Sequence, residues 1–146
     1  MSYMTKCWEH AKKRSVDLSY DERSWRLREY ARPTQIAYVR IMGQYQGDPR
    51  GIEVRHHSGG ERWAFVLPDA SQGGMRIQLF DKFGFSGHQN YPSLTDAVEE
   101  MVRQGYRTPD VGALDLASKT VSWAEGLAWM EKLHQYGTTG ASKAAA

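Results

Sequence analysis

Apolar and polar side chains alternate most regularly in the middle of the chain. Residues 52–57 alternate, a Ser58-Gly59-Gly60 break follows, and residues 62–67 alternate again. Two alternating runs joined by a glycine-containing turn predict a β-hairpin.

A second pair of strands is predicted after the Gly73-Gly74 break. Met75, Ile77 and Leu79 alternate with polar residues, and the chain then turns at residues 81–84. A glycine ends this turn because it adopts positive φ without steric cost. The returning residues 85–91 are more polar, so we place them at an edge of the sheet.

A helix is predicted to begin at Ser93, with Asp96 three residues on to complete a capping pair and Gly105 beyond its end. Its apolar stripe consists of Leu94, Ala97, Val98, Met101 and Val102, and the residues expected to face water are Asp96, Glu99, Glu100 and Arg103. We expect the stripe to cover a sheet face made of Ile52, Val54, Trp63, Phe65, Leu67, Ile77 and Leu79.

A second helix is predicted from Ser122 to Tyr136, opened by a capping box of Ser122 and Glu125 and closed by a glycine. Its inner stripe consists of Trp123, Leu127, Met130 and His134. Trp129 falls on the flank with Leu133 and Tyr136. Two interpretations of this flank stay open, a protein contact and packing against the N-terminal segment.

These elements predict an α+β fold, with an antiparallel sheet of about four or more strands and helices packed on one face. We expect residues 1–136 to form a single domain and residues 137–146 to form a flexible C-terminal tail. Residues 105–118 are too short and too apolar to separate two domains. The pattern in residues 20–45 permits either helix or strand.

Charge and cysteine content indicate the cellular compartment of the protein more than its function. Residues 1–60 carry 11 Lys and Arg against 7 Asp and Glu, so the basic excess lies in the N-terminal part of a chain with net charge +2. The single cysteine, Cys7, cannot form an internal disulfide, which is typical of a reducing compartment. Without a secretory signal or a membrane-spanning run, the chain is predicted to be cytoplasmic.

The sequence carries no complete catalytic or metal-binding pattern. His56 and His57 are adjacent on a strand, so we expect their side chains on opposite faces, and adding His88 does not complete a zinc site. Cys7 and His10 lack a third group and an oxyanion hole. Pro68-Asp69 lacks the further acid and lysine of a nuclease, so a turn is predicted there. We therefore predict no enzyme activity, catalytic residue, metal, cofactor or small-molecule substrate.

The polar face of the sheet is the best candidate for binding. By alternation it displays Glu53, Arg55, His57, Arg62, Arg76, Gln78, Ser86, His88 and Asn90. Arginines, histidines and amides on one surface suit phosphates or an acidic protein patch. Two other interpretations stay open, an ordinary solvated sheet face and a face covered by the N-terminal third. The predicted binding residues are Arg55, His57, Arg62, Arg76, Gln78, His88 and Trp129.

A further indication comes from the run Phe80-Asp81-Lys82-Phe83-Gly84-Phe85-Ser86-Gly87-His88, followed by Tyr91-Pro92-Ser93-Leu94-Thr95-Asp96-Ala97-Val98 and Gly105-Tyr106. It resembles small accessory domains of proteins from bacterial plasmids, conjugative elements and phages. The resemblance implies a mobile-element setting, in which small non-enzymatic proteins bind host machinery, and it transfers no functional residue.

Two functions are therefore expected. The first is a non-enzymatic binding protein that engages a host protein or nucleoprotein complex, as an inhibitor of a bacterial defence system such as CRISPR-Cas. The alternative is a DNA- or RNA-binding protein that acts through the arginine-bearing sheet face and the basic N-terminal segment. Neither function requires a membrane.

Overall fold

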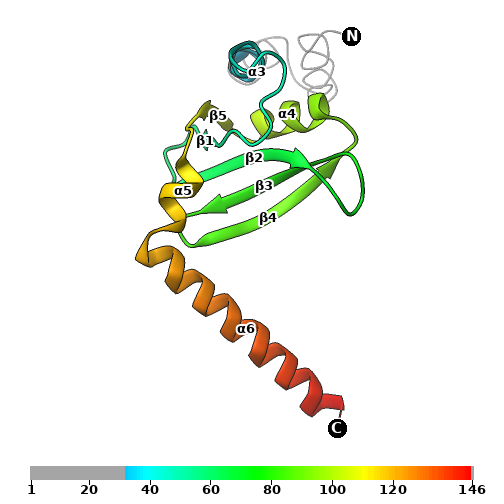
Figure 1. The fold of residues 1–146 in the computed structure, drawn as a ribbon, viewed down its shortest axis with the longest axis vertical. Coiled ribbons are helices and arrows are strands. Elements are labelled where there is room, and N and C mark those ends of the chain that lie inside the picture. The colour runs from blue at the N-terminus through cyan, green and yellow to red at the C-terminus, as the bar shows by residue number, and fades with distance from the viewer. Residues whose placement is uncertain (1–31, 146) are drawn as a thin grey trace, which may run out of the picture.

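A computed structural model of the protein describes the backbone of residues 32–145 and the side chains of residues 32–135 (Figure 1). The predictions for Cys7 and His10, and for helices or strands in the first 31 residues, lie outside the described residues. Within the described part of the chain, no helix is long and apolar enough to cross a membrane.

The sheet has five antiparallel strands in the order β4-β3-β2-β1-β5. They are β1 (Val54–His56), β2 (Arg62–Pro68), β3 (Met75–Asp81), β4 (Gly84–Tyr91) and β5 (Tyr106–Pro109). Both predicted hairpins are confirmed, and β4 lies at an edge as expected. β5 was not predicted. It pairs with β1, about 50 residues earlier in the sequence.

In the part of the chain that the structure describes, four helices accompany the sheet, and the fold is α+β as predicted. They are α3 (Arg32–Gln44), α4 (Leu94–Arg103), α5 (Ala113–Ser118) and α6 (Val121–Ala145). The structure places a helix directly at Pro33, where the sequence left the choice open. α5 was not predicted. With β5 it lies in residues 105–118, which the sequence analysis judged too short and too apolar to separate two domains.

The start of α4 follows the sequence prediction closely. The Ser93 hydroxyl accepts a hydrogen bond from the Asp96 backbone N–H at 3.1 Å, which satisfies one of the exposed donors of the first turn. One expectation is wrong, because Glu99 is buried rather than facing water. The cause is α3, which packs against α4 and covers that side of it.

One face of the sheet is sealed by α3 and α4. The core between them consists of Ala37, Ile41, Val54, Ala64, Val66, Ile77, Ala97, Val98, Met101, Val102 and Tyr106. Val98 and Met101 are at most 1% exposed, so the predicted α4 stripe points into this core.

The predicted composition of this face is wrong for β2. Ala64 lies opposite Val54 and Leu79, and Val66 lies opposite Ile77, so Ala64 and Val66 face the two helices. Successive strand residues point to opposite faces. Trp63, Phe65 and Leu67 therefore lie on the other face. The sequence could not indicate which side of β2 faces the helices, because both faces of β2 are apolar.

That other face is covered at one end by α5 and the first turn of α6. The second core consists of Phe65, Phe80, Ala113, Ala117 and Trp123. The Trp123 ring meets the ring of Phe85 edge-on, with centroids 5.4 Å apart, and packs on Phe80. Helices therefore pack on both faces, not on one as predicted.

α6 departs from its prediction at both ends. The Thr120 hydroxyl, not that of Ser122, accepts from the Trp123 backbone N–H at 3.2 Å. The helix also continues past Gly137 to Ala145 and projects away from the body of the protein (Figure 1). Of the predicted inner stripe only Trp123 is buried, while Leu127, Met130 and His134 are exposed.

Candidate functional site

The structure divides the predicted binding residues among three places. Arg55, Arg76, Gln78 and His88 share the sheet face opposite α3 and α4, which we call the open face. His57 and Arg62 lie instead at the end of the β1–β2 hairpin, and Trp129 lies on α6 with 62% of its surface exposed. The prediction of a single polar face is therefore wrong.

Arg62 does not lie on the open face, because of the register in which β2 pairs with β3. It lies opposite Asp81 and one residue before Trp63, so its side chain starts on the side of α3 and α4. There its guanidinium Nη2 lies 3.3 Å from Nδ1 of His56 and donates to the Ser58 hydroxyl at 3.1 Å.

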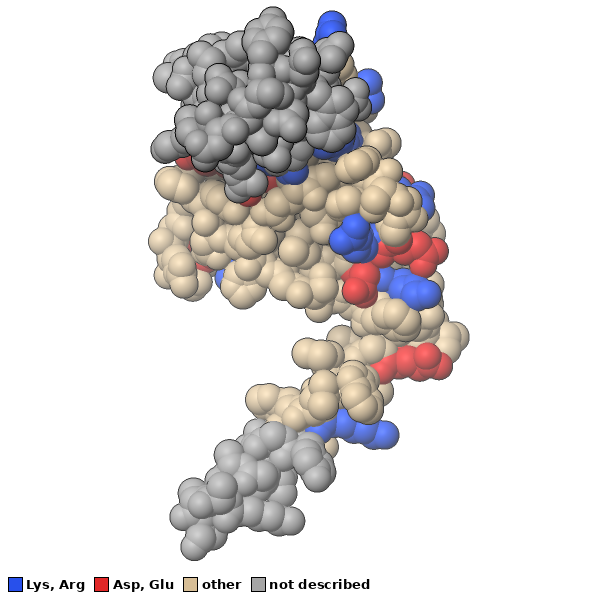
Figure 2. Space-filling model, turned by 180° about the vertical axis from the view of Figure 1, so that it is seen from behind, with Lys and Arg blue, Asp and Glu red and all other residues tan. Residues whose placement is uncertain are grey.

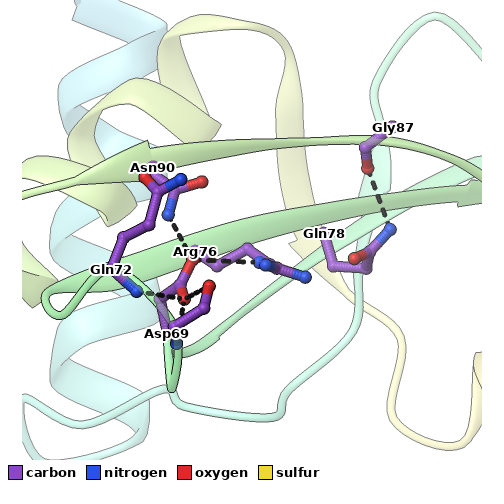
Figure 3. A network of polar contacts seen from close by, with 7 residues as sticks. Asp69, Gln72, Arg76, Gln78, Gly87 and Asn90 are labelled. Atoms are coloured by element: carbon purple, nitrogen blue, oxygen red, sulfur yellow. Dashed lines mark hydrogen bonds and ion pairs between the residues drawn. The ribbon is translucent and has the colours of Figure 1, made fainter.

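On the open face, the groups expected to bind a partner are partly used by the protein itself. Gln78 donates from Nε2 to the Gly87 carbonyl oxygen at 2.9 Å, and Arg76 donates from Nε to Asp69 at 3.2 Å (Figure 3). The Arg76 guanidinium extends along the strand toward Gln78 (Figure 3). Its side chain keeps 35% exposure, so Arg76 can still meet a partner.

Asp69 organises the β2–β3 turn beneath this face. Its carboxylate accepts from the backbone N–H and hydroxyl of Ser71, both at 2.8 Å, from the Gln72 backbone N–H at 3.1 Å, and from the Asn90 amide. The Ser71 hydroxyl bond, followed by the two backbone bonds, lowers the pKa of Asp69 far below its usual range. The turn predicted at Pro68-Asp69 is confirmed, and Asp69 serves structure.

A hollow of about 440 Å³ lies on the open face beside this turn. It is lined by Phe65, Leu67, Pro68, Asp69, Ala70, Ser71, Arg76, Gln78 and Phe85. Phe85 and Leu67 are 53% and 41% exposed, respectively, so the hollow has an uncovered apolar floor. It offers apolar contact more than charge.

The positive charge gathers elsewhere, in a groove between α3 and β5. Its volume is about 380 Å³, and its lining is Arg32, Pro33, Ile36, Ala37, Arg40, His57, Arg107 and Thr108. Among these described residues there is no Asp or Glu. We call this feature the cationic groove.

Three separate segments bring the cationic groove together. Arg32, Ile36 and Arg40 are spaced four residues apart on α3, so they lie along one side of the helix. Arg107 comes from β5, and its guanidinium donates to the Thr34 hydroxyl at 3.4 Å, which ties β5 to α3. His57 follows the last residue of β1.

Sequence reasoning found His57 but missed Arg32, Arg40 and Arg107. The four-residue spacing on α3 was a usable signal, and it was lost because the segment was not assigned as a helix. Arg107 carried no local signal, because only the pairing of β5 with β1 brings it to the groove.

His56 and His57 sit side by side, which contradicts the expectation of opposite faces. Their rings stack with centroids 5.1 Å apart. The register of the β1–β5 pair shifts between Arg55 and His56, and His57 already lies beyond the strand, so strict alternation fails there.

The hydrogen bonds of His56 define its neutral form. Nδ1 accepts from the Ser58 backbone N–H at 3.1 Å, so the ring proton belongs on Nε2, which lies 3.0 Å from the Gln104 carbonyl oxygen. Burial, with the charge of Arg62 next, lowers the pKa of His56. Burial, followed by Arg107 and Arg62, lowers the pKa of His57. Both rings are therefore neutral at pH 7.

No group of three or more His, Cys, Asp or Glu side chains able to hold a metal ion occurs among the described residues. The charged groups of the cationic groove are all donors, because they are guanidinium groups that stay protonated at any physiological pH, and the His57 imidazole beside them can gain a proton. The chemistry of such an arrangement suits anions.

Comparisons of this chain with protein-family models, with curated proteins and with solved structures found no match. The function proposed below is therefore inferred from the residues and their geometry.

Proposed function

We propose that this chain is a non-enzymatic protein that binds nucleic acid, alone or within a host nucleoprotein complex, through the cationic groove. The observation that carries the proposal is the convergence of Arg32, Arg40, Arg107 and His57 on a groove whose described lining holds no acid.

Phosphate groups are the anions that this geometry suits best. Arg32 and Arg40 are eight residues apart on α3, which separates their backbones by about 12 Å along the helix. That distance suits two separate phosphates of one strand better than a single small anion. Guanidinium groups bind phosphate oxygens in a bidentate manner, which strengthens each contact.

The groove suits contact with the phosphate backbone of a nucleic acid better than recognition of its bases. Its lining offers charged donors, two aliphatic side chains and a proline, and holds no Phe, Tyr or Trp ring on which a base could stack. We therefore expect affinity with little sequence preference and a strong dependence on salt.

Titration by fluorescence anisotropy with labelled single- and double-stranded oligonucleotides tests the proposal. With three phosphate contacts we expect affinity to fall about 40-fold between 50 and 200 mM salt. The double variant Arg32→Ala with Arg40→Ala should lower the slope of log affinity against log salt by about two.

Arg55→Ala is the matched control, because Arg55 is exposed on the open face and is not one of the residues that line the groove. We expect it to bind as the unmodified chain does. Unchanged affinity in the double variant, or an equal loss in Arg55→Ala, would refute binding through the groove.

The role as an inhibitor of a bacterial defence system stays a prediction within this proposal. A defence nucleoprotein presents phosphate backbone, so the groove suits it as well as bare nucleic acid. Capture of such a complex by the unmodified chain but not by the double variant would support that role. Equal capture by both would argue against it.

A further inference from the structure

Three uncovered features meet on one side of the protein: the outer edge of β4, the hollow on the open face, and the exposed apolar side chains of α6. None belongs to the cationic groove. Each is of a kind that proteins normally bury or protect, so we considered what would cover all three.

The β4 edge is open to strand pairing. β4 is the last strand of the sheet, its register with β3 is regular from Gly87 to Tyr91, and no backbone hydrogen bond from other described residues reaches its outer side. Edge strands are usually blunted by charged residues or proline. β4 contains no proline and no Asp, Glu, Lys or Arg.

The exposed apolar side chains of α6 lie on the same side of the helix as the residues that pack against the sheet. Trp123 is buried against the sheet, and Gly126 lies so close to the Phe83 carbonyl oxygen that a Cβ would collide with it. At 100° per residue, Met130 lies about 20° and Leu127 about 40° from Trp123 around the helix. These residues keep facing the sheet side after the helix has left the body.

A notch separates the body from the projecting part of α6 (Figure 2). Uncharged side chains line the side of α6 that faces the notch, while the acidic and basic side chains visible in this view lie on its outer side (Figure 2). Leu127, Met130 and Leu133 are 50–59% exposed. We call these three residues the α6 stripe.

We propose that a second copy of this chain fills the notch: the two β4 edges pair antiparallel about a two-fold axis, and each α6 stripe covers the hollow on the open face of the other copy. Pairing about an axis perpendicular to the sheet keeps both open faces on the same side. α6 departs from that side, because its first turn packs on the open face.

The dimensions agree with this arrangement. From Leu127 to Leu133 the stripe extends about 9 Å along the helix axis. Neighbouring strands are about 4.8 Å apart, so the stripe reaches across two strand spacings, from the partner's β4 to its β2. The hollow lies within this range, because its lining comes from β2, β3, β4 and the β2–β3 turn.

The occupant is a second copy because one symmetry operation covers all three features at once. A two-fold interface uses the same patch on both subunits, and this patch contains both the projecting stripe and the hollow that receives it. Each half-exposed large side chain leaves roughly 100 Å² in water. With the stripe, Leu67 and Phe85 from both copies, burial is on the order of 1,000 Å², enough for a specific interface.

Sedimentation velocity of the full chain from 1 to 100 µM tests the proposal. We expect a dimer, and we expect the double variant Met130→Asp with Leu133→Asp to weaken association at least 100-fold. The control is Ala128→Asp, which adds a carboxylate to an exposed position of the same helix outside the stripe. It should remain dimeric, and circular dichroism should confirm that all variants fold.

Cross-linking then tests the position of α6. Leu67→Cys and Leu133→Cys are made separately, each with Cys7→Ser, and the two proteins are mixed and treated with a short bismaleimide. A linked species containing both variants is expected, whereas the Leu67→Cys and Ala128→Cys mixture should link poorly. A monomer at 100 µM, a dimer that the stripe variant does not weaken, or equal linking in both mixtures would overturn the proposal.

Discussion

The two faces of the sheet are built from the same strands and are completed to different extents. Under α3 and α4, the residues of the first core are almost entirely buried, with Val54, Ala64, Ile77 and Val98 at 0% exposure. On the open face, α5 and the first turn of α6 cover only one end, and Phe85 stays 53% exposed.

This difference assigns the stability of the fold to one face of the sheet and contact with a partner to the other. The sealed face holds the fold together, because α3 and α4 pack on its apolar core. The open face keeps an apolar floor that α5 and α6 of the same chain cover only in part, so a second copy can bury the rest. The cationic groove lies apart from both, between α3 and β5.

The largest expected effect comes from the sealed face. Met101→Ala should lower the free energy of unfolding by about 2–5 kcal/mol, because it leaves a cavity in a packed core. Leu67→Ala, on the open face, should cost less than about 1 kcal/mol. Urea denaturation in the Met130→Asp, Leu133→Asp background measures both without a contribution from association. Equal losses would contradict the contrast between the two faces.

A smaller effect is expected where α6 docks. Gly126→Ala places a Cβ against the Phe83 carbonyl oxygen, so either the β3–β4 turn or the helix must shift. Overpacking of this kind costs about 1–3 kcal/mol. Thermal unfolding measures the loss, and Gly43→Ala is the control, since a Cβ at that exposed helical glycine meets no atom within 4 Å. A loss no larger than in the control would mean that α6 does not dock as described.

Features encoded by neighbouring residues could be predicted from the sequence. The two hairpins and the start of α4 depend on glycine turns, alternation and the Ser93 cap, all of which act within a few residues. β5 escaped prediction because it has four residues and depends on pairing with β1. The phase of β2 was misjudged because Trp63, Phe65 and Leu67 look like a better core than Ala64 and Val66.

The candidate site was harder to predict for the same physical reason. Its charged residues come from α3, β5 and the end of β1, and only the folded arrangement brings them together. Alternation placed His57 and Arg62 with Arg76. It fails for His57 at the irregularity after Arg55, and Arg62 was misplaced because the phase of β2 was misjudged. Arg76 was placed correctly, yet its bond to Asp69 could not be foreseen from the turn sequence.

The smallest expected effects are those of pH on the stability of the fold and on the affinity for an oligonucleotide, and the two effects have opposite signs. The pKa values of His56 and His57 are lower in the folded protein than the usual 6.5, so the unfolded chain binds more protons below that value. Stability should therefore be fully present above pH 6.5 and fall as the pH drops through the folded-state values.

Affinity for an oligonucleotide should instead rise over the same range, because a bound phosphate favours the protonated His57. His57→Ala should remove most of this rise. Anisotropy titrations at pH 7.5 and 5.5 measure it, and equal affinity at both values would exclude a role for His57.

Hydrogen exchange read by mass spectrometry tests most directly whether charge and apolar contact occupy separate surfaces. Added oligonucleotide should slow exchange in α3 and β5 and leave β4 unchanged. Raising the protein concentration from 1 to 100 µM should slow exchange in β4 and the projecting part of α6 and leave α3 unchanged. Protection of β4 by the oligonucleotide, or protection of α3 by concentration alone, would contradict the account.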